Sequence, residues 1–598
     1  MADNARDVHS FAQPETARVR HLDLDLTVSF EDRTLAGVAE LKMDRPGGQA
    51  GPLILDTRAL AIETVECSAD GTTYESAKWT LGEADAILGS PLTIDLPAAA
   101  IMVRIRYQSS PEASGLQWLD PLQTAGKMQP FLFSQNQSIH ARSWIPIQDS
   151  PGVRVTYTAR IRTPKNLTAL MSADRKGASG GVHHFAMELP VPAYLIALAV
   201  GDLSFAEIGP RTGVYAEPSV LAKAAWEFAD MEKMVEAVEK LYGPYRWGRY
   251  DLLILPPSFP FGGMENPRLT FATPTVIAGD RSLVGLVSHE LAHSWSGNLV
   301  TNATWSDFWL NEGFTTFIEN RIQEAVYGRE QALMEQVLAR RELDRDLAEF
   351  TAPNQILHID LTGRDPDEGT THVPYVKGSL LLRQMEQAFG RDTFDAYLKK
   401  YFDHFAFQSI TTTTMLEHLQ RELFDSQPAL AAQIPTHEWI YEPGLPAQAP
   451  MAASAKLQRV SQIARDYASG SLQTQALETS AWDTAAWSSQ EWLEFLQVLP
   501  PLSADQMTQL DHAFHLTESG NYEVLDQWLQ MSIQADYRAA YPRIEAFLME
   551  VGRQRFIKPL YVELMKTPDG QNRARAIYAR ARERYHPIAQ TAIDKIVK

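Results

Sequence analysis

Two histidines four residues apart, His289 and His293, stand in an otherwise apolar and aromatic stretch, with Glu290 between them and Glu312 nineteen residues after the second histidine. Residues four apart share one face of a helix, so both imidazoles can bind the same metal ion. Glu290 lies on the same turn, close enough to contact a water bound to that metal. A catalytic zinc usually has three protein ligands and one water, and Glu312 is the natural candidate for the third ligand. The spacing therefore predicts a zinc site made by His289, His293 and Glu312.

The chemistry that such a site could perform is the hydrolysis of an amide. Zinc lowers the pKa of a bound water from 15.7 to about 7 and polarises a carbonyl oxygen. Glu290 can accept a proton from that water and hand it to the leaving amine, so a peptide bond is a suitable target. A plainer alternative is a pair of core histidines beside a glutamate on a helix surface. Random sequence of this composition contains His-Glu-x-x-His roughly 0.02 times per chain, so chance is a weak explanation.

A second helix must return Glu312 to the metal. The residues 298–309, NLVTNATWSDFW, can turn the chain, and Ser306 or Asp307 is the expected N-cap of that helix. The helical pattern as a whole extends over residues 282–424.

The first third of the chain has the period-two pattern of half-buried antiparallel strands. The alternating apolar residues are Leu22, Leu24, Leu26, Val28 and Phe30 in one stretch and Val155, Tyr157, Ala159 and Ile161 in another. The run 191–203, VPAYLIALAVGDL, is apolar almost throughout and predicts a fully buried strand.

Helices dominate the rest of the chain. Residues 221–243 have helical spacing and end at a glycine, and DLLILPP at 251–257 predicts a short strand. The segment 441–455 is rich in Pro, Gly and Ala, which is typical of a linker. Beyond it, apolar residues recur at helical spacing, and Ser503 with Gln506 predicts a capping box.

Composition limits the classes of function. A chain of 598 residues should form roughly three or four domains. The net charge of −20 disfavours nucleic-acid or anionic-membrane partners, which require a basic surface. The single cysteine, Cys67, excludes an intrachain disulfide. We find no signal-peptide core at the N-terminus and no apolar run of membrane-spanning length, so we expect a cytoplasmic protein.

The motifs resemble those of a known family. HELAHSW, whose second histidine is separated by eighteen residues from the glutamate of WLNEGF, is similar to the zinc aminopeptidases of peptidase family M1, the gluzincins. Upstream, GGMEN at 262–266 resembles the family's Gly-x-Met-Glu-Asn exopeptidase motif. Segments throughout the chain resemble the leukotriene A4 hydrolase-like subfamily, and we expect a bacterial member. These segments lie at 134–157, 365–378, 439–446 and 552–561.

This resemblance implies an exopeptidase site beside the metal. Glu265 would bind the substrate's free α-amine, and Asn266 would shape the amine site. Gly262, Gly263 and Met264 would complete the motif. A carboxylate near the metal can hold an ammonium and thereby fix the scissile bond one residue away.

Other residues of the cleft follow from the same resemblance. Tyr375 would stabilise the tetrahedral oxyanion, a task that suits a phenol donor beside the metal. Gln137 and Gln135 would contact the bound N-terminal residue. Glu319, seven residues after Glu312 and two helical turns along the same face, would support a zinc-binding histidine.

Charged residues would select the substrate. Asp367 would favour basic N-terminal residues and direct water in epoxide hydrolysis. Arg553 and Arg555 would bind a peptide's C-terminal carboxylate, although the family has lysine at the second position and the two side chains differ in reach. The lipid-mediator hydrolases of the family carry a tyrosine where this chain has Thr370, which puts epoxide activity in doubt but leaves peptidase chemistry intact.

The resemblance also implies a multidomain α+β architecture. We expect an N-terminal β-sandwich-like (saddle) domain over 1–203, a thermolysin-like zinc catalytic domain over 204–441, a linker over 442–455 and a helical, superhelical or armadillo-like domain over 456–598. The expected activity is release of single N-terminal residues from short peptides with a free N-terminus, using one Zn²⁺ per chain. Epoxide hydrolysis of a leukotriene A4-like fatty acid is the alternative function, and a binding protein built on the same scaffold is a third. The sequence leaves open the oligomeric state and the preferred N-terminal residue.

Overall fold

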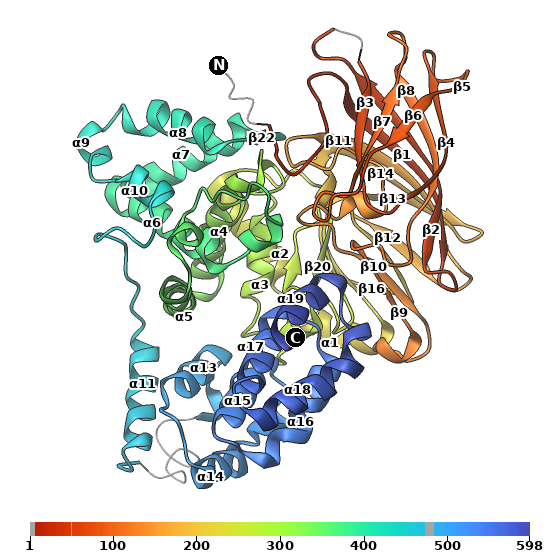
Figure 1. Cartoon of the computed structure of the whole chain (residues 1–598). Coiled ribbons are helices and arrows are strands. Elements are labelled where there is room, and N and C mark those ends of the chain that lie inside the picture. Colours follow the sequence, from red (N-terminus) through yellow and green to blue (C-terminus); the bar gives the residue numbers. More distant parts are fainter. Residues whose placement is uncertain (1–5, 49–50, 473–483) are drawn as a thin grey trace.

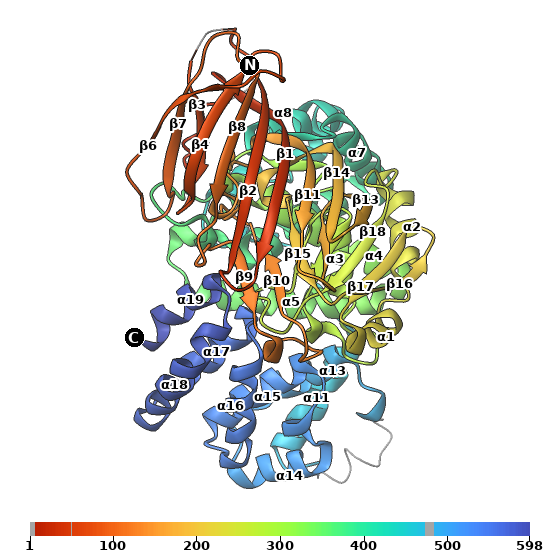
Figure 2. The same ribbon diagram turned by 90° about the vertical axis from the view of Figure 1, so that its right-hand side faces the viewer.

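The computed structural model describes residues 6–48, 51–472 and 484–598 of the chain. An N-terminal domain of β-sheets, a central domain of mixed helices and strands, and a C-terminal helical domain follow one another in sequence (Figure 1). The domains meet near helix α3 (Gly285–Ala292) of the central domain, as both views show (Figures 1 and 2). This order of domains confirms the predicted fold class.

The main sheet of the N-terminal domain has the strand order β13-β14-β11-β1-β2-β8-β4-β5. Its strands are β1 (Arg18–Ser29), β2 (Thr34–Asp44), β4 (Ala61–Ser68), β5 (Glu75–Ser76), β8 (Met102–Gln108), β11 (Arg154–Arg162), β13 (Asp174–Ser179) and β14 (Val182–Pro192). The alternating residues predicted on β1 and β11 are buried, as expected. However, β1 pairs with β11 in parallel, so the antiparallel prediction was wrong for this pair. Alternation reports which face of a strand is buried and carries no information on strand direction.

Two further sheets complete the N-terminal domain, with strand orders β3-β7-β6 and β12-β15-β10-β9. Their strands are β3 (Leu53–Thr57), β6 (Lys78–Leu81), β7 (Ser90–Asp95), β9 (Leu116–Leu119), β10 (Phe131–Ser134), β12 (Thr168–Met171) and β15 (Leu198–Gly201). The prediction of one strand over 191–203 was wrong. The 3₁₀ turn η3 (Ala193–Leu195) separates the end of β14 from β15, although the run is largely buried as predicted. An all-apolar run is equally compatible with a buried turn, because burial on every side leaves no periodicity.

The central domain contains a mixed sheet of order β16-β17-β18-β20-β19, in which β17, β18 and β20 are parallel. Its strands are β16 (Ser204–Gly209), β17 (Thr212–Ala216), β18 (Tyr250–Ile254), β19 (Gly263–Met264) and β20 (Leu269–Ala272). The predicted strand near DLLILPP is β18.

The single helix predicted over 221–243 is two helices, α1 (Pro218–Glu227) and α2 (Met231–Tyr242). Ala224, Phe228 and Met231 are all buried, so the apolar period continues across the turn that separates the helices. The predicted glycine terminus is correct, since Gly243 caps α2 in a positive-φ conformation.

The predicted helical stretch 282–424 is interrupted. Its α-helices are α3, α4 (Trp309–Tyr327), α5 (Arg329–Glu349), α6 (Gly378–Phe389), α7 (Arg391–His404) and α8 (Thr412–Leu419), with π-helical turns η8 (Val373–Lys377) and η9 (Gln420–Phe424). Strands β21 (Val300–Asn302) and β22 (Gln408–Ile410) pair within this stretch. The 3₁₀ turns η4 (Pro274–Val276), η5 (Trp305–Asp307), η6 (Ala352–Gln355) and η7 (Pro366–Gly369) link these elements. Helices α9 (Pro428–Ala431) and α10 (Thr436–Tyr441) close the central domain.

The C-terminal domain begins with α11, after residues 442–454 that form no regular element. Its described helices are α11 (Ala455–Ala468), α13 (Ser489–Val498), α14 (Ala504–Phe514), α15 (Tyr522–Gln534), α16 (Tyr541–Glu550), α17 (Gln554–Leu564), α18 (Pro568–Ala581) and α19 (Pro587–Val597). The predicted capping box of Ser503 and Gln506 opens α14. This domain has its own hydrophobic core, whereas one continuous core runs through the other two domains. Within the described part of the chain, every helix is too short or too polar to span a bilayer.

The C-terminal domain docks on the central domain through backbone hydrogen bonds. The Gly552 amide donates to the Pro257 carbonyl (2.9 Å) and the Gln554 amide donates to the Pro260 carbonyl (2.8 Å). The loop that receives them leads directly into β19, so the start of α17 lies beside the GGMEN segment.

Candidate metal centre and active site

Helix α3 places the two predicted histidines at its C-terminal end. His293 is the C-cap, and its amide still donates to the carbonyl of His289, so both residues keep helical geometry. Their Nε2 atoms lie 3.2 Å apart. The imidazoles therefore converge on one point, as the spacing predicted.

Helix α4 brings Glu312 to the same point. Its Oε2 lies 3.3 Å from His289 Nε2 and 3.4 Å from His293 Nε2. Ligands about 2.0–2.1 Å from a zinc ion at tetrahedral angles are separated by about 3.3–3.4 Å, so the three atoms outline one face of a zinc tetrahedron. Glu312 Oε2 is buried and has no hydrogen-bond partner among the described residues, as expected for an atom whose partner is a metal ion. The residues present therefore fit the implied zinc.

The predicted N-cap of α4 was wrong. The turn η5 precedes α4, and Phe308 occupies the N-cap position. Asp307 instead accepts hydrogen bonds from the Thr304 hydroxyl (2.8 Å) and from the Thr412 amide (2.8 Å). Its side chain ties α4 to α8, and the helix starts without a side-chain cap because η5 continues directly into it.

Hydrogen bonds on the far side of each imidazole fix its tautomer. His289 Nδ1 lies 3.0 Å from Glu319 Oε2, and His293 Nδ1 lies 2.9 Å from the Ser296 carbonyl oxygen. These partners only accept, so each Nδ1 carries a proton and each Nε2 offers its lone pair to the metal. Glu319 therefore lies where the resemblance placed it, behind a ligand histidine.

The charge distribution favours a cation. Burial alone would lower the pKa of His293, but the carboxylates of Glu265 and Glu312 outweigh it and raise that pKa to about 9. These two carboxylates thus favour positive charge on His293, and a divalent metal ion can take the place of the proton. Glu265, Glu290 and His293 also each offer one atom within 4.8 Å of the others. We favour the His289, His293 and Glu312 set as ligands because its three atoms have tetrahedral separations.

Glu290 is buried on α3 next to the metal position, against strand β19. A Cβ atom added to Gly263 would lie 2.2 Å from Glu290 Oε1, so only glycine allows strand and carboxylate to lie this close. Burial raises the pKa of Glu290 to about 8, and the nearby carboxylates of Glu265 and Glu312 add to that rise. A bound cation lowers the pKa of Glu290 and so offsets part of this rise. A pKa near the working pH is what a general base requires.

The GGMEN segment continues from β19 into the site. Glu265 is buried, accepts from Gln137 Nε2 (3.4 Å) through its carboxylate, and accepts from Asn298 Nδ2 (2.7 Å) through its backbone carbonyl. Met264 Sδ contacts Gln135 Nε2 (3.2 Å). These contacts place both predicted glutamines beside the segment, with Gln137 half-buried and Gln135 buried behind it.

Asn266 is buried, and its Nδ2 has no hydrogen-bond partner among the residues that the structure describes. An unsatisfied buried amide of this kind is costly unless a ligand or water meets it. Its position directly after Glu265 is consistent with the predicted role in shaping the amine site.

Tyr375 lies on the π-helical turn η8, a geometry that is common at functional sites. Its ring stacks on that of His289, with centroids 5.8 Å apart. A Cβ on Gly313 would lie 2.8 Å from the Cα of Gly378, so α4 and the start of α6 cross backbone to backbone and bring Tyr375 close to Glu312. Burial and the acidic neighbours raise the pKa of Tyr375 well above its usual value, so the phenol keeps its proton and can donate it in a hydrogen bond.

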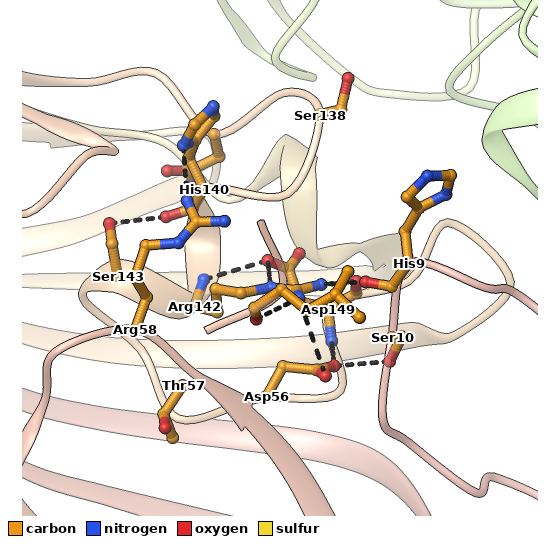
Figure 3. A network of polar contacts seen from close by, with 12 residues as sticks. His9, Ser10, Asp56, Thr57, Arg58, Ser138, His140, Arg142, Ser143 and Asp149 are labelled. Atoms are coloured by element: carbon orange, nitrogen blue, oxygen red, sulfur yellow. Dashed lines mark hydrogen bonds and ion pairs between the residues drawn. The ribbon is translucent and has the colours of Figure 1, made fainter. Parts of the chain in front are cut away.

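Asp367, on η7, faces the loop that carries the predicted glutamines. Its Oδ1 accepts from the Ser138 amide (3.1 Å) and its Oδ2 lies 3.1 Å from His140 Nε2. Gln137 contacts Glu265 while its neighbour Ser138 contacts Asp367, so one loop joins the two carboxylates. Figure 3 shows His140 joined to Arg58 and Ser143 in a polar network, with Ser138 on the same loop.

The two predicted arginines differ in their surroundings. Arg553 is buried, donates to Glu523 Oε1 (3.0 Å) and Thr275 Oγ1 (3.1 Å), and would lie 3.1 Å from a Cβ on Gly262. Arg555 is half-exposed and lies 3.5 Å from Glu523 Oε2. Arg553 thus reaches the GGMEN segment, whereas the only partner found for Arg555 among the described residues is Glu523. Thr370 is exposed at the end of η7.

A cavity of about 420 Å³ lies farther along α4, between α5, α6 and residues 450–453. None of the predicted site residues lines it. Its arginines Arg383 and Arg391 lie 3.2 Å and 2.8 Å from carboxylate oxygens of Glu386, and Arg391 also lies 3.0 Å from Glu324 Oε2. These arginines are therefore paired with acidic residues of the wall.

Several residues of the site escaped sequence reasoning. Asn298 contacts the backbone of Glu265, His140 contacts Asp367, and Arg58 in turn contacts His140. Phe308 packs its ring edge-on against Tyr375, with ring centroids 6.1 Å apart. None has a spacing signal, because each comes from a different part of the chain and meets the site only through the fold.

Comparisons with known proteins follow the same three-part division. Family models match residues 18–195 (Peptidase M1 N-terminal domain), 226–434 (Peptidase family M1 domain) and 487–597 (Leukotriene A4 hydrolase, C-terminal). Leukotriene A-4 hydrolase of Xenopus laevis is 37% identical over 98% of both chains. Leucine aminopeptidase 2 of Yarrowia lipolytica is 35% identical over 99% of this chain and 93% of its own.

Solved structures are similar as well. Yeast LTA4 hydrolase in complex with bestatin superposes with a TM-score of 0.93 at 32% identity, covering 100% of this chain and 98% of the other. The M1 zinc metallopeptidase of Deinococcus radiodurans, at 23% identity and a TM-score of 0.57, covers 75% of this chain and 99% of its own, and shares the fold.

Proposed function

The chain belongs to peptidase family M1 as a metallo-aminopeptidase, and on that premise we propose that it releases single N-terminal residues from short peptides at the centre formed by His289, His293 and Glu312. One observation carries the proposal. Three ligand atoms lie 3.2–3.4 Å apart, and the Glu265 carboxylate lies within 4.8 Å of His293 and Glu290. A metal position and an ammonium position are therefore about one residue apart.

We propose that the metal is Zn²⁺, one per chain, held by the two Nε2 atoms and by Glu312 Oε2. When bound, the ion supplies Lewis acidity at this position. Glu319 and the Ser296 carbonyl keep the lone pairs of the ligand histidines directed at it.

The reaction then depends on four side chains. Glu265, assisted by Gln137, binds the α-ammonium of the substrate. Glu290 removes a proton from the attacking water and delivers it to the leaving amine. Tyr375 donates a hydrogen bond to the oxygen that gains negative charge in the transition state.

The tail of the substrate is bound by a basic pair in our proposal. Arg553 is held rigidly by Glu523 and Thr275 beside Gly262, and Arg555 lies farther out. Carboxylate binding there favours di- and tripeptides with both termini free. We further propose the domain limits 1–203, 204–441 and 456–598, joined by 442–455, and a cytoplasmic location, which the single buried Cys67 supports.

Metal removal gives the first test of this function. With a panel of fluorogenic aminoacyl amides, we expect release of the N-terminal residue, loss of activity with a chelator and recovery with added zinc. The reason is that the proposed mechanism takes its Lewis acidity from the metal ion at this centre. Activity that persists in a sample shown to be metal-free by elemental analysis would contradict the proposal.

The variant Tyr375→Phe tests the oxyanion donor. We expect kcat to fall by about 10²-fold with little change in KM, because the hydroxyl acts only in the transition state. Steady-state kinetics on an alanyl amide measures both constants. Tyr441→Phe, at an exposed tyrosine on α10, is the matched control and should retain wild-type kcat.

Epoxide hydrolysis of a fatty acid is a second candidate, favoured by the similarity to the Xenopus leukotriene A-4 hydrolase. Asp367 and the basic pair are compatible with it, whereas the exposed Thr370 stands where the lipid-mediator hydrolases have a tyrosine. Product formation from leukotriene A4 by the zinc-loaded protein, with peptide hydrolysis blocked, separates the two activities.

A further inference from the structure

We propose that His140 is a positioning residue for Asp367, and that Arg58 of the N-terminal domain fixes the imidazole in the tautomer that this task requires. The inference rests on the proposed function, since it gives Asp367 the task of binding a basic side chain on the substrate's first residue. It adds a directed series of hydrogen bonds, from Arg58 to His140 to Asp367, that begins in the N-terminal domain and ends at Asp367 of the central domain.

The direction of these hydrogen bonds follows from which atoms can donate and which can only accept. His140 Nδ1 lies 2.9 Å from Arg58 Nη1 and 2.9 Å from Ser114 Oγ. A guanidinium can only donate and keeps its proton in proteins, so Nδ1 must be the acceptor. The ring proton is therefore on Nε2, which donates to Asp367 Oδ2 at 3.1 Å. Without Arg58, either tautomer would satisfy Ser114, and the donor to Asp367 would not be assured.

Both oxygens of Asp367 are occupied by fixed donors. The Ser138 amide donates to Oδ1 and His140 donates to Oδ2, so the carboxylate cannot rotate freely. Burial opposes its ionisation, but these two hydrogen bonds outweigh it and hold the pKa of Asp367 below its usual value. Burial and the adjacent Asp367 charge raise the pKa of Asp365. The negative charge of the pair is therefore concentrated on Asp367.

The position of Asp367 identifies the part of the substrate that it meets. Gln137 contacts the proposed amine anchor Glu265, and the next residue, Ser138, contacts Asp367. The side chain of a first residue branches from the carbon that carries its amine, so a residue bound at Glu265 can extend its side chain to the region of Asp367. That carboxylate is 24% exposed whereas His140 is 10% exposed, so the chain of hydrogen bonds ends at a charge that a ligand can reach.

A buried polar network around Arg142 fixes Arg58 and His140 in place (Figure 3). Arg142 is fully buried, and it donates to Asp149 Oδ2 (3.0 Å) and to the His9 carbonyl (2.8 Å). Its own carbonyl accepts from the Arg58 amide (2.8 Å), and the Ser143 hydroxyl donates to the His140 carbonyl (2.7 Å). Arg58 and His140 are thus fixed by one buried network that belongs to the N-terminal domain. Removing Arg142 would unpair buried charges, so this residue is unsuitable for the test.

The test compares two substitutions of His140 in the full-length, zinc-loaded protein. His140→Leu removes the donor to Asp367, whereas His140→Gln retains an N–H donor of similar reach. The substrates are an arginyl and an alanyl fluorogenic amide, which differ in the charge of the first side chain. For His140→Leu we expect KM for the arginyl amide to rise about tenfold, because a hydrogen bond to a charged group is worth roughly that factor. We expect kcat to be unchanged, and both constants for the alanyl amide to be unchanged within about twofold. His140→Gln should recover most of the arginyl KM.

The outcomes separate three possibilities. Equal losses on both amides in His140→Leu, without recovery in His140→Gln, would make His140 a structural residue and overturn the inference. A wild-type protein that cleaves both amides without preference for the arginyl amide would overturn the basic pocket at Asp367 and leave the aminopeptidase function standing. Failure to cleave any amide would overturn the proposed function itself. Thermal melting and zinc content of each variant show whether a lost activity reflects unfolding.

Discussion

Replacing Glu290 by glutamine is expected to lower kcat by about 10³-fold while zinc remains bound. The carboxylate is buried against Gly263 and lies within 4.8 Å of Glu265 and His293, outside the set of atoms with tetrahedral separations. Glutamine has the same shape and should keep the contact with β19, but an amide cannot accept a proton from water. The expected result is a kcat defect with a nearly unchanged KM.

Steady-state kinetics together with zinc analysis checks this prediction. Glu236→Gln, at an exposed position on α2, changes the same functional group far from the chemistry and should be indistinguishable from wild type. Near-normal turnover by Glu290→Gln would remove the general-base assignment. Loss of zinc from that variant would instead point to Glu290 as a ligand.

The second large effect is expected for Glu265→Gln. Its carboxylate is buried and accepts a hydrogen bond only from Gln137 Nε2 among described side chains, so it is available for the substrate's ammonium. Unpairing a buried charge pair costs about 4 kcal/mol, which corresponds to about 10³-fold in kcat/KM. We expect most of that loss for peptides with a free N-terminus.

Two comparisons make this prediction specific. Glu265→Asp keeps the charge at shorter reach and should lose less than Glu265→Gln. N-acetylated peptides, which lack the ammonium, should be poor substrates for the wild type, and Glu265→Gln should lower their cleavage little further. A wild-type kcat/KM for free peptides in Glu265→Gln would mean that the amine is bound elsewhere.

Sequence reasoning succeeded where the chemistry is local. His289, His293 and Glu290 share one helix, so a period of 3.6 residues suffices to bring them together. Glu312 required only one additional helix. Resemblance supplied the more distant residues, among them Glu265, Tyr375 and Arg553, which the fold brings to the metal from separate loops and domains.

What remained beyond the sequence depends on contacts between distant backbones. The crossing of α4 and α6 at Gly313 and Gly378 decides where Tyr375 lies, and two glycines 65 positions apart give no signal of it. Arg58 and His140 are likewise 82 residues apart and carry no recognisable spacing. Where helix or strand boundaries were wrong, as for α1 and α2, the apolar pattern continued through a turn because both elements face one core.

The contact between Gly263 and Glu290 also limits the distance between Glu265 and Glu290, two residues of the proposed site. Glu265 follows Gly263 by two residues on one backbone, and Glu290 lies on the helix that this backbone touches. In the proposed mechanism, the separation between the bound amine and the attacked carbonyl is therefore set largely by the main chain. In that mechanism the distance accommodates one amino acid, and the absence of a side chain at Gly263 lets β19 lie this close to α3. We expect an enzyme of this fold that removes two residues at a time to hold this strand farther from the helix.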